Sequence, residues 1–271
     1  MADDYGIRPQ GFRLPEQTRI GTVRLQVADL ARSIHYYETV VGLQVRERSS
    51  DTAALGPHDD AATLVFLQEK PGVTRAPARG AYGLFHFAIL LPDRASLGRF
   101  VTHLAHTRVR AGSADHLVSE ALYLTDPDGL GIEVYADRPR ETWQYASGEV
   151  RMTTEPLDLM SLQAAGGNLA WKGAPAGTVM GHVHLHVGDL DEAARFYGDT
   201  VGFDTTMWSY PGARFFSAGG YHHHLGTNTW SPGPSATDDQ AKLIEWELIV
   251  PGSEPRTLTD PWGTRVGIKD K

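Results

Sequence analysis

The stretch GTVRLQVADL at residues 21–30 returns as GHVHLHVGDL at residues 181–190, and this repeat decides the architecture. Three further residues recur with the same spacing, because Tyr37, Val41 and Gly42 correspond to Tyr197, Val201 and Gly202. An agreement that holds without a gap over this length indicates two copies of one structural unit.

Each copy predicts a strand followed by a helix. Apolar and polar residues alternate from 23 to 27, which is typical of a half-buried strand. Asp29 can then cap a helix, and Gly42 can end that helix in the left-handed conformation. The apolar positions of the helix fall on one face, at Leu30, Ile34, Tyr37 and Val41.

A second unit begins with the apolar run at 85–91 and continues with a predicted helix at 94–106. It closes with YLTDPDG at 123–129, which predicts a strand running into a tight turn, and with a strand at 132–135. The order of strand, helix and further strands is therefore the same as in the first repeat, and all these units are interpreted as βαβββ modules.

A shortened version of this unit stands near the C-terminal end. The turn recurs as LTDPWG at 258–263 after a predicted strand at 244–250, and the interval between them is too short for a helix. The sequence therefore predicts an α+β fold of four modules, the last one truncated, at residues 20–70, 82–136, 179–230 and 242–270. Along the chain we expect a first module pair, a linker and a second module pair, at 1–136, 137–178 and 179–271.

Composition narrows the classes of function. The 271 residues include no cysteine, which excludes disulfides, thiolate metal sites and thiol nucleophiles. The formal net charge is −8 at pH 7 and the sequence has no run of lysine or arginine, so we expect no nucleic-acid partner. No apolar stretch reaches membrane-spanning length and the polar N-terminus has no signal region, so we expect a cytoplasmic protein without membrane contact.

The repeat and its closing motif, Asp-Pro-x-Gly-x-x-x-Glu at 126–133, resemble the vicinal oxygen chelate superfamily. That superfamily includes glyoxalase I, bleomycin-resistance proteins and type I extradiol dioxygenases. The resemblance implies that modules curl in pairs into two cup-shaped mixed-sheet half-barrels. It also implies that metal ligands project from the first and last strands of the modules.

Comparison of the modules at these positions favours one ligand set. The first strands of modules one to four offer Thr22, His86, His182 and Glu245, and the last strands of modules two and four offer Glu133 and Gly267. Only modules two and three supply two histidines and a glutamate, namely His86, His182 and Glu133. Pairing module one with two and three with four would separate these ligands, so we expect modules two and three to share a cup. An alternative site in modules three and four would use His182, His224 and Glu245.

The segment HLVSEALYLTDPDGLGIE at 116–133 is similar to the extradiol dioxygenase signature from its histidine onward. Ala114 departs from the pattern, because the family prefers a glycine or a similar residue there. The resemblance implies that Glu133 is the carboxylate ligand and that Tyr123 and His116 lie beside the substrate hydroxyls.

The resemblance also implies a further histidine beside the metal, on a late strand. Alignment of YHHHLG at 221–226 on its apolar residue favours His223, and alternation along a strand would turn it away from the faces of His222 and His224. His184 and His186 share a face with His182, so either of them could be the ligand or a pocket residue. Three tryptophans could line the pocket or simply pack, namely Trp143, Trp171 and Trp208.

The function implied by the resemblance is Fe(II)-dependent cleavage of a catechol-like aromatic diol by dioxygen, giving a muconic semialdehyde-type product. Mn(II) or another divalent metal is an alternative to Fe(II). His223 would act as acid and base, and Tyr123 would donate a hydrogen bond to a developing oxyanion. Two other functions stay open: a metal-dependent glyoxalase or isomerase with Glu245 as its spare carboxylate, and a non-enzymatic protein that sequesters a small molecule such as an antibiotic. The expected partners are the diol and dioxygen, and a homo-oligomer is possible.

Overall fold

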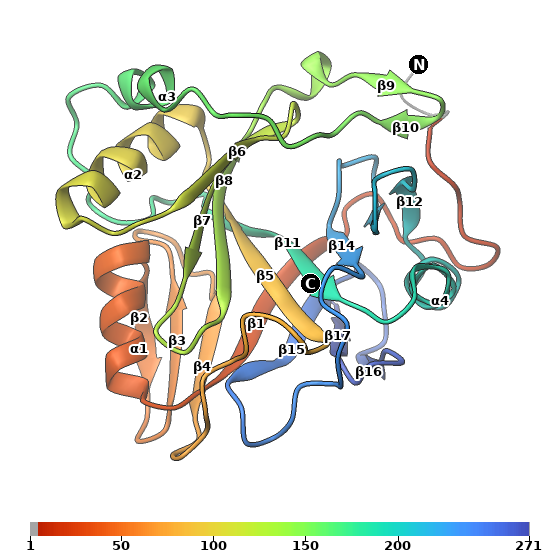
Figure 1. Ribbon diagram of the computed structural model, residues 1–271, viewed down its shortest axis with the longest axis horizontal. Coiled ribbons are helices and arrows are strands. Elements are labelled where there is room, and N and C mark those ends of the chain that lie inside the picture. Colours follow the sequence, from red (N-terminus) through yellow and green to blue (C-terminus); the bar gives the residue numbers. More distant parts are fainter. Residues whose placement is uncertain (1–4, 271) are drawn as a thin grey trace.

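The computed structural model describes residues 5–270, and its elements follow the module order along the chain (Figure 1). Module one comprises β1 (Arg19–Val27), α1 (Leu30–Tyr36), β2 (Gln44–Arg48), β3 (Thr52–Gly56) and β4 (Val65–Glu69). Module two comprises β5 (Gly83–Leu90), α2 (Arg94–Thr107), β6 (Gly112–Asp115), β7 (Ser119–Thr125) and β8 (Gly131–Asp137). The segment that follows carries β9 (Tyr145–Ala146), β10 (Glu149–Val150) and α3 (Leu159–Gly166).

The C-terminal part repeats this order and then shortens it. Module three comprises β11 (Val179–His186), α4 (Leu190–Ala193), β12 (Asp204–Met207), β13 (Ala213–Ser217) and β14 (Leu225–Asn228). Module four has strands alone, which are β15 (Lys242–Ile249), β16 (Arg256–Thr259) and β17 (Arg265–Lys269). The prediction that the last module lacks a helix is therefore confirmed.

Two mixed sheets divide the modules between them. The eight-stranded sheet has the order β12-β13-β14-β11-β5-β8-β7-β6, and the seven-stranded sheet has the order β16-β17-β15-β1-β4-β3-β2. Modules two and three thus share one sheet, as expected, and modules one and four share the other. We call the first the histidine cup and the second the charged cup. Each cup takes one module from either side of residues 137–178.

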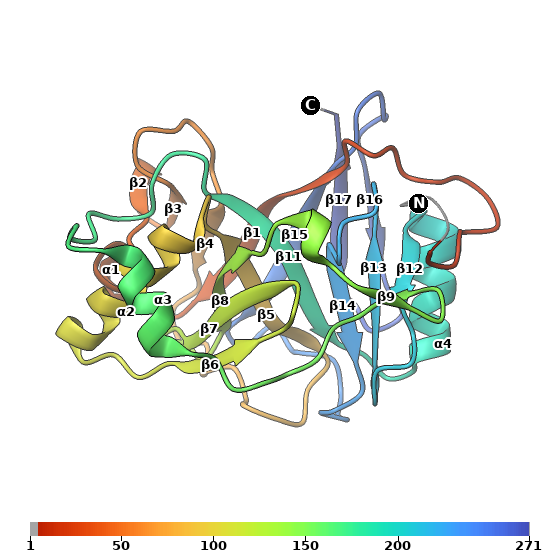
Figure 2. The ribbon, with the colours of Figure 1, turned by 90° about the horizontal axis from the view of Figure 1, so that it is seen from above.

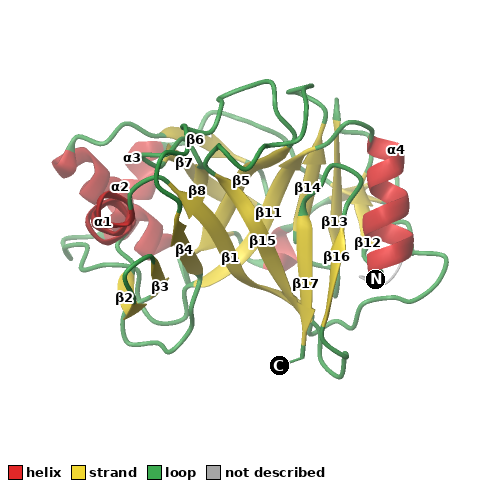
Figure 3. Cartoon of the chain, turned by 90° about the horizontal axis from the view of Figure 1, so that it is seen from below, coloured by secondary structure: helices red, strands yellow, loops and turns green. Residues whose placement is uncertain are grey.

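Helices cover the two ends of the strand layers. Seen from above, α1, α2 and α3 lie at one end of the molecule and α4 at the other (Figure 2), with the strands between them (Figure 3). Helices α2 and α3 approach so closely that a side-chain carbon on Gly98 would lie 2.2 Å from the carbonyl oxygen of Leu162. No helix of residues 5–270 is both long and apolar enough to cross a membrane.

The predicted helix caps are present in both repeats. Asp29 accepts a hydrogen bond from the backbone N–H of Arg32, and Gly42 ends the helix with φ at 84°. The last part of each helix differs from the expected α-helix, because Tyr37–Val41 and Ala194–Val201 form wider π-helical turns. The tyrosine of each turn is fully buried.

These two buried tyrosines connect modules that are neighbours in sequence. Tyr37 donates its hydroxyl hydrogen to Asp126 Oδ2 at 3.1 Å, and Tyr197 donates to Asp260 Oδ2 at 2.7 Å. Each aspartate opens an Asp-Pro turn, and its Oδ1 accepts two backbone N–H groups of that turn. The strands therefore join modules two with three and one with four, whereas these hydrogen bonds join one with two and three with four.

Replacement of Asp126 by asparagine tests the energetic role of this contact. Burial raises the pKa of Asp126 from 3.8 to about 6, against hydrogen bonds that lower it. The folded state therefore holds the proton of the Asp126 carboxyl more tightly than the unfolded chain does. The stabilisation that results is complete below about pH 4 and is lost as the pH rises through about 6. Asparagine cannot ionise, so the free energy of unfolding of Asp126→Asn relative to wild type should rise by up to about 3 kcal/mol from pH 4 to pH 7.5.

Urea unfolding of both proteins at several pH values measures this difference. The free energy of unfolding of Asp260→Asn relative to wild type should also rise with pH, because burial raises the pKa of Asp260 as well. A difference between Asp126→Asn and wild type that stays constant with pH would contradict the account.

Candidate metal centre

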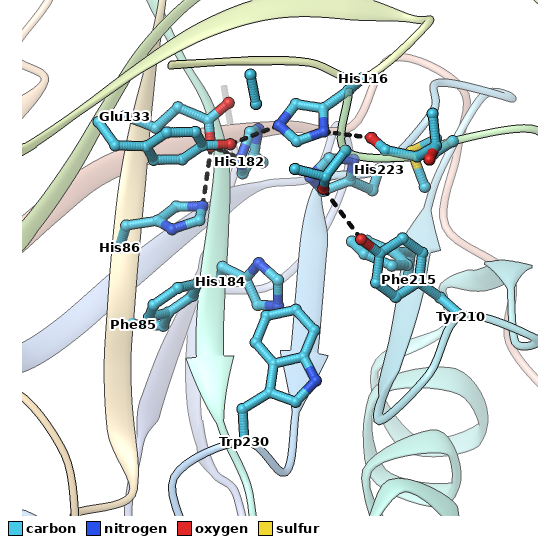
Figure 4. Close-up of a pocket in the computed structure, with 15 residues that line it drawn as sticks. Phe85, His86, His116, Glu133, His182, His184, Tyr210, Phe215, His223 and Trp230 are labelled. Carbon is cyan, nitrogen blue, oxygen red and sulfur yellow. Dashed lines mark hydrogen bonds and ion pairs between the residues drawn. The ribbon is translucent and has the colours of Figure 1, made fainter. Parts of the chain in front are cut away.

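Three adjacent strands of the histidine cup bring together the predicted ligands. His86 lies on β5, Glu133 on β8 and His182 on β11, and β5 stands between the other two in the sheet (Figure 4). The Nε2 atoms of His86 and His182 lie 3.0 Å and 3.1 Å from Glu133 Oε2. All three residues are buried. Among the described residues, this is the one group of three whose ligand atoms all lie within 4.8 Å of one another.

A small residue keeps this space open. Ala88 pairs with Glu133 on one side and with His182 on the other, so it stands between them in the sheet. It lies on the same face as His86, two residues earlier on the strand. A larger side chain at position 88 would occupy the space in which the three ligand atoms meet.

The donor set fits a divalent metal ion. His86 Nε2 is buried and lacks a well-aligned hydrogen-bond partner, although it lies 3.0 Å from the carboxylate. For metal–ligand bonds of about 2.1 Å at right angles, two ligand atoms lie about 3 Å apart, which agrees with the distances to Glu133. Two imidazoles and one carboxylate on one side of a metal leave its remaining positions open, the arrangement of non-haem Fe(II) oxygenases.

The protonation states of the triad suit the same role. Burial by itself raises the pKa of Glu133, but the interactions with His182 and His86 outweigh it and hold that pKa well below its ordinary value. Burial lowers the pKa of His182 to about 4, although Glu133 opposes the change. At neutral pH His182 is therefore uncharged, and its contact with the carboxylate is a hydrogen bond rather than an ion pair. Metal ligands need an ionised carboxylate and a neutral imidazole.

The charged cup has ion pairs at the corresponding place. Glu245 lies on β15 and pairs with Arg265 at 3.1 Å, and Glu247 binds both Arg24 and Lys269. Glu245 therefore belongs to the other sheet, away from the histidines of β11. The alternative site of His182, His224 and Glu245 is wrong for this reason.

The triad opens into a cavity of about 240 Å³ that is mainly aromatic. Four rings contribute to its wall, two on strands β5 and β13 and two in connections before β13 and after β14, and these are Phe85, Phe215, Tyr210 and Trp230 (Figure 4). An engineered cavity of about 150 Å³ accommodates benzene, so this one has room for a ring with substituents. The cavity therefore has room for a small ring next to the triad.

The segment between the module pairs closes one side of the cavity. Met152, Thr153 and Thr154 line it, although they lie in the predicted linker. Glu149, on β10, accepts hydrogen bonds from both backbone N–H groups of residues 208 and 209 and from the Ser209 hydroxyl. This carboxylate ties the segment to the connection that carries Tyr210. The linker is therefore part of the cavity wall.

His116 and Tyr123 lie together on the cavity wall. His116 Nδ1 lies 2.6 Å from the carbonyl oxygen of Thr153, and its Nε2 lies 2.6 Å from the Tyr123 hydroxyl. Because a carbonyl can only accept, Nδ1 carries the hydrogen, and a neutral His116 must accept the Tyr123 hydrogen at Nε2. Burial, followed by the charge of Glu133, raises the pKa of Tyr123 well above its ordinary value, so this tyrosine keeps its hydrogen.

His223 also faces the cavity, but for a different reason from the one expected. Strand β14 begins at Leu225, so the three consecutive histidines precede the strand and strand alternation does not apply to them. His223 lines the cavity with its ring centroid 4.1 Å from that of His182. His222 instead contacts Asp137, and His224 accepts a hydrogen bond from the backbone N–H of Ala218. Burial, followed by the neighbouring imidazoles, lowers the pKa of His223 well below its ordinary value.

The structure shows which of the other histidines and tryptophans considered from the sequence line the cavity. His184 is a cavity residue outside the triad, and His186 instead binds Asn228 at 2.7 Å. Of the tryptophans considered, none lines this cavity, whereas Trp230 does. Sequence patterns did not identify Phe85, Tyr210, Phe215 or residues 152–154, because the irregular connections that carry most of them have no periodicity to read.

A family model described as Glyoxalase/Bleomycin resistance protein/Dioxygenase superfamily matches residues 19–134 and 179–245. The chain belongs to this superfamily. The match ends within β8 and resumes at the start of β11, so the segment that closes the cavity lies outside it. The resemblance to the vicinal oxygen chelate fold is therefore confirmed.

Similar proteins within the superfamily include one with substantial sequence identity. A protein of Bacillus subtilis (strain 168) named catechol-2,3-dioxygenase is 43% identical over 248 residues, which cover 90% of this chain and 86% of that protein. Among solved structures, one from Bacillus subtilis has a TM-score of 0.62 at 13% identity, covering 95% of this chain and 86% of that one. Glyoxalase I from Zea mays has a TM-score of 0.53 at 16% identity, with coverage of 94% and 92%. The structural likenesses establish the fold alone.

Removal of one ligand charge tests the assignment of the metal centre. Glu133→Gln keeps the shape of the side chain but loses its charge, so the affinity for Fe(II) or Mn(II) should fall by at least about 100-fold. Glu245→Gln is the matched control, because it removes the charge of a carboxylate in the charged cup and should leave metal binding unchanged. Metal content after anaerobic loading and dialysis measures both. Loss of metal in Glu245→Gln with retention in Glu133→Gln would overturn the assignment.

Proposed function

We propose that this protein is an extradiol dioxygenase that uses a divalent metal, Fe(II) or Mn(II), to cleave a catechol-like aromatic diol with dioxygen. The observation that carries the proposal is the triad of two histidines and one glutamate at the wall of an aromatic cavity. The relative named catechol-2,3-dioxygenase supports the reaction class, because it is 43% identical over 90% of this chain. The product would be a muconic semialdehyde-type compound.

In this proposal His86, His182 and Glu133 hold the metal. The metal, when bound, supplies a positive charge that favours deprotonation of a bound hydroxyl and a centre through which diol and dioxygen can react. The chain's own contribution is to orient the substrate ring, since Phe85, Phe215 and Trp230 offer apolar faces beside the triad. These aromatic walls also reduce the access of water to the reacting atoms.

His223 and Tyr123 are proposed to handle protons and hydrogen bonds at the substrate oxygens. His223 is adjacent to His182 on the cavity side and can exchange a proton with a substrate hydroxyl. Tyr123 gives its hydrogen to a neutral His116 in the present arrangement. If His116 gains a proton at Nε2, it donates to the Tyr123 oxygen instead, and the tyrosine hydrogen becomes available to a substrate oxygen. His116 would therefore determine when Tyr123 acts as a donor.

The two other functions have less support. A glyoxalase-type isomerase would normally use a second carboxylate as base, and Glu133 is the single carboxylate among the described residues that line the cavity. The spare candidate, Glu245, is paired with Arg265 in the other cup. A protein that only sequesters a small molecule has no need of a buried carboxylate between two imidazoles, which is costly to maintain without a metal.

Oxygen uptake by the iron-loaded protein on catechol tests the proposed reaction. We expect one dioxygen consumed for each catechol, together with a yellow semialdehyde product followed by its absorbance. The Glu133→Gln variant, treated in the same way, should show neither. Metal binding by wild type without oxygen uptake on catechol or on substituted catechols would refute the dioxygenase proposal and favour the isomerase.

Conversion of Tyr123 to phenylalanine tests the proposed hydrogen bond to the substrate. The variant keeps the ring and removes the hydroxyl, so kcat should fall by about 10²-fold while metal content is unchanged. The matched control is Tyr210→Phe, because Tyr210 lines the same cavity but its hydroxyl binds Thr154 at 3.0 Å. Equal losses of kcat in the two variants would argue against a specific role for Tyr123.

A further inference from the structure

A chain of hydrogen bonds between side chains leads from the cavity to Asp137 at the end of β8. His223 Nδ1 lies 2.7 Å from His222 Nδ1, and His222 Nε2 lies 2.9 Å from Asp137 Oδ1. The Tyr221 hydroxyl also donates to Asp137 Oδ1, at 3.2 Å. His223 lines the cavity, whereas His222 and Asp137 do not. His223 packs against the His182 ring, but none of the hydrogen bonds of this chain involves the three candidate ligands, His116 or Tyr123.

Burial and packing fix the middle residue of the chain. His222 is fully buried, with its ring 4.0 Å from that of Tyr221 and 5.1 Å from that of Trp143. Asp137, at the end of β8, keeps 24% of its side chain exposed. The chain therefore has one partly solvated carboxylate at its outer end and an enclosed imidazole in its middle. Turning this ring to exchange its two nitrogens would break both of its hydrogen bonds.

The acceptors determine where the hydrogens sit. Asp137 Oδ1 accepts, so His222 Nε2 carries a hydrogen. A neutral imidazole has one ring hydrogen, which leaves His222 Nδ1 as an acceptor, and the hydrogen between the two histidines then belongs to His223 Nδ1. The remaining nitrogen of His223, Nε2, is then unprotonated, and within residues 5–270 the hydrogen bond of the His223 ring is made through Nδ1.

We propose that His222 and Asp137 are positioning residues that hold His223 in one tautomer, with its hydrogen on Nδ1 and its Nε2 lone pair presented to the cavity. The same device orients a catalytic histidine through a carboxylate in hydrolytic triads, but here a second imidazole stands between the two. The tautomer follows from the two hydrogen bonds of a neutral His222. Its use in the reaction rests on the proposed function: the O–H bond of a substrate hydroxyl breaks, its hydrogen forms a bond with Nε2, and the electron pair stays on the oxygen.

Nitrogen NMR of the histidine rings in the metal-free protein tests the tautomer without any use of activity. The signals of His223 are identified by their loss in His223→Gln. In wild type we expect a protonated Nδ1 and an unprotonated Nε2, and in His222→Phe we expect a mixture of both tautomers. Phenylalanine preserves the ring that packs on Trp143 and Tyr221 but offers no acceptor. A wild-type His223 with its hydrogen on Nε2 would overturn the proposal, even if His222→Phe does not fold.

Kinetics of the metal-loaded enzyme separate positioning from simple loss of structure. His222→Phe should lower kcat by at least about tenfold, with KM and metal content changed less than about twofold. His222→Asn should recover part of kcat, because its amide oxygen can accept the hydrogen of His223 Nδ1. His224→Phe is the matched control, a buried neighbour outside the chain of hydrogen bonds.

Equal kcat in His222→Phe and wild type would also overturn the proposal. If wild type cleaves no diol, the proposed function fails, while the NMR result still decides the tautomer.

Discussion

The antiparallel pairing of β5 with β11 is the constraint on which the candidate centre depends. It places His86, from the N-terminal half of the sequence, beside His182 from the C-terminal half, and the parallel pairing of β5 with β8 adds Glu133. Ala88 lies between His182 and Glu133 in the sheet, and its small side chain leaves the space in which the ligand side chains meet. A shift of β11 by one residue would turn His182 to the opposite face of the sheet, so the register of this strand is a condition for assembly of the proposed ligand set.

The duplicated modules carry identical contacts but different chemistry. Tyr37 with Asp126 and Tyr197 with Asp260 are the same hydrogen bond in two places, and both serve to dock one module on the next. The two cups differ at their centres, where one has imidazoles around a carboxylate and the other has arginine and lysine around glutamates. The same strand arrangement therefore accommodates either set of residues, and among residues 5–270 the donor set suited to a metal occurs in the histidine cup alone.

The sequence predicted those parts of the fold and site that depend on local pattern. Strand alternation, the Asp29 cap and the turn at Asp126 are encoded within a few residues, and the repeat extends them to the whole chain. The triad could be predicted because the signature around Glu133 is long and only two modules complete the ligand set. Residues 152–154 and the turn that carries His222 and His223 have no period, so their positions depend on distant packing that a local pattern does not contain.

The sharing of both sheets between the two halves of the chain has a consequence for biosynthesis. When residues 1–136 have left the ribosome, β1 and β5 still lack their partners β15 and β11, and neither sheet can be completed. His86 and Glu133 therefore have no His182 beside them until β11 has been made, and the proposed ligand set cannot exist in a nascent chain that ends before β11. Under this proposal, a metal would be acquired late, after synthesis of the second half of the chain, and incomplete chains would not assemble the centre.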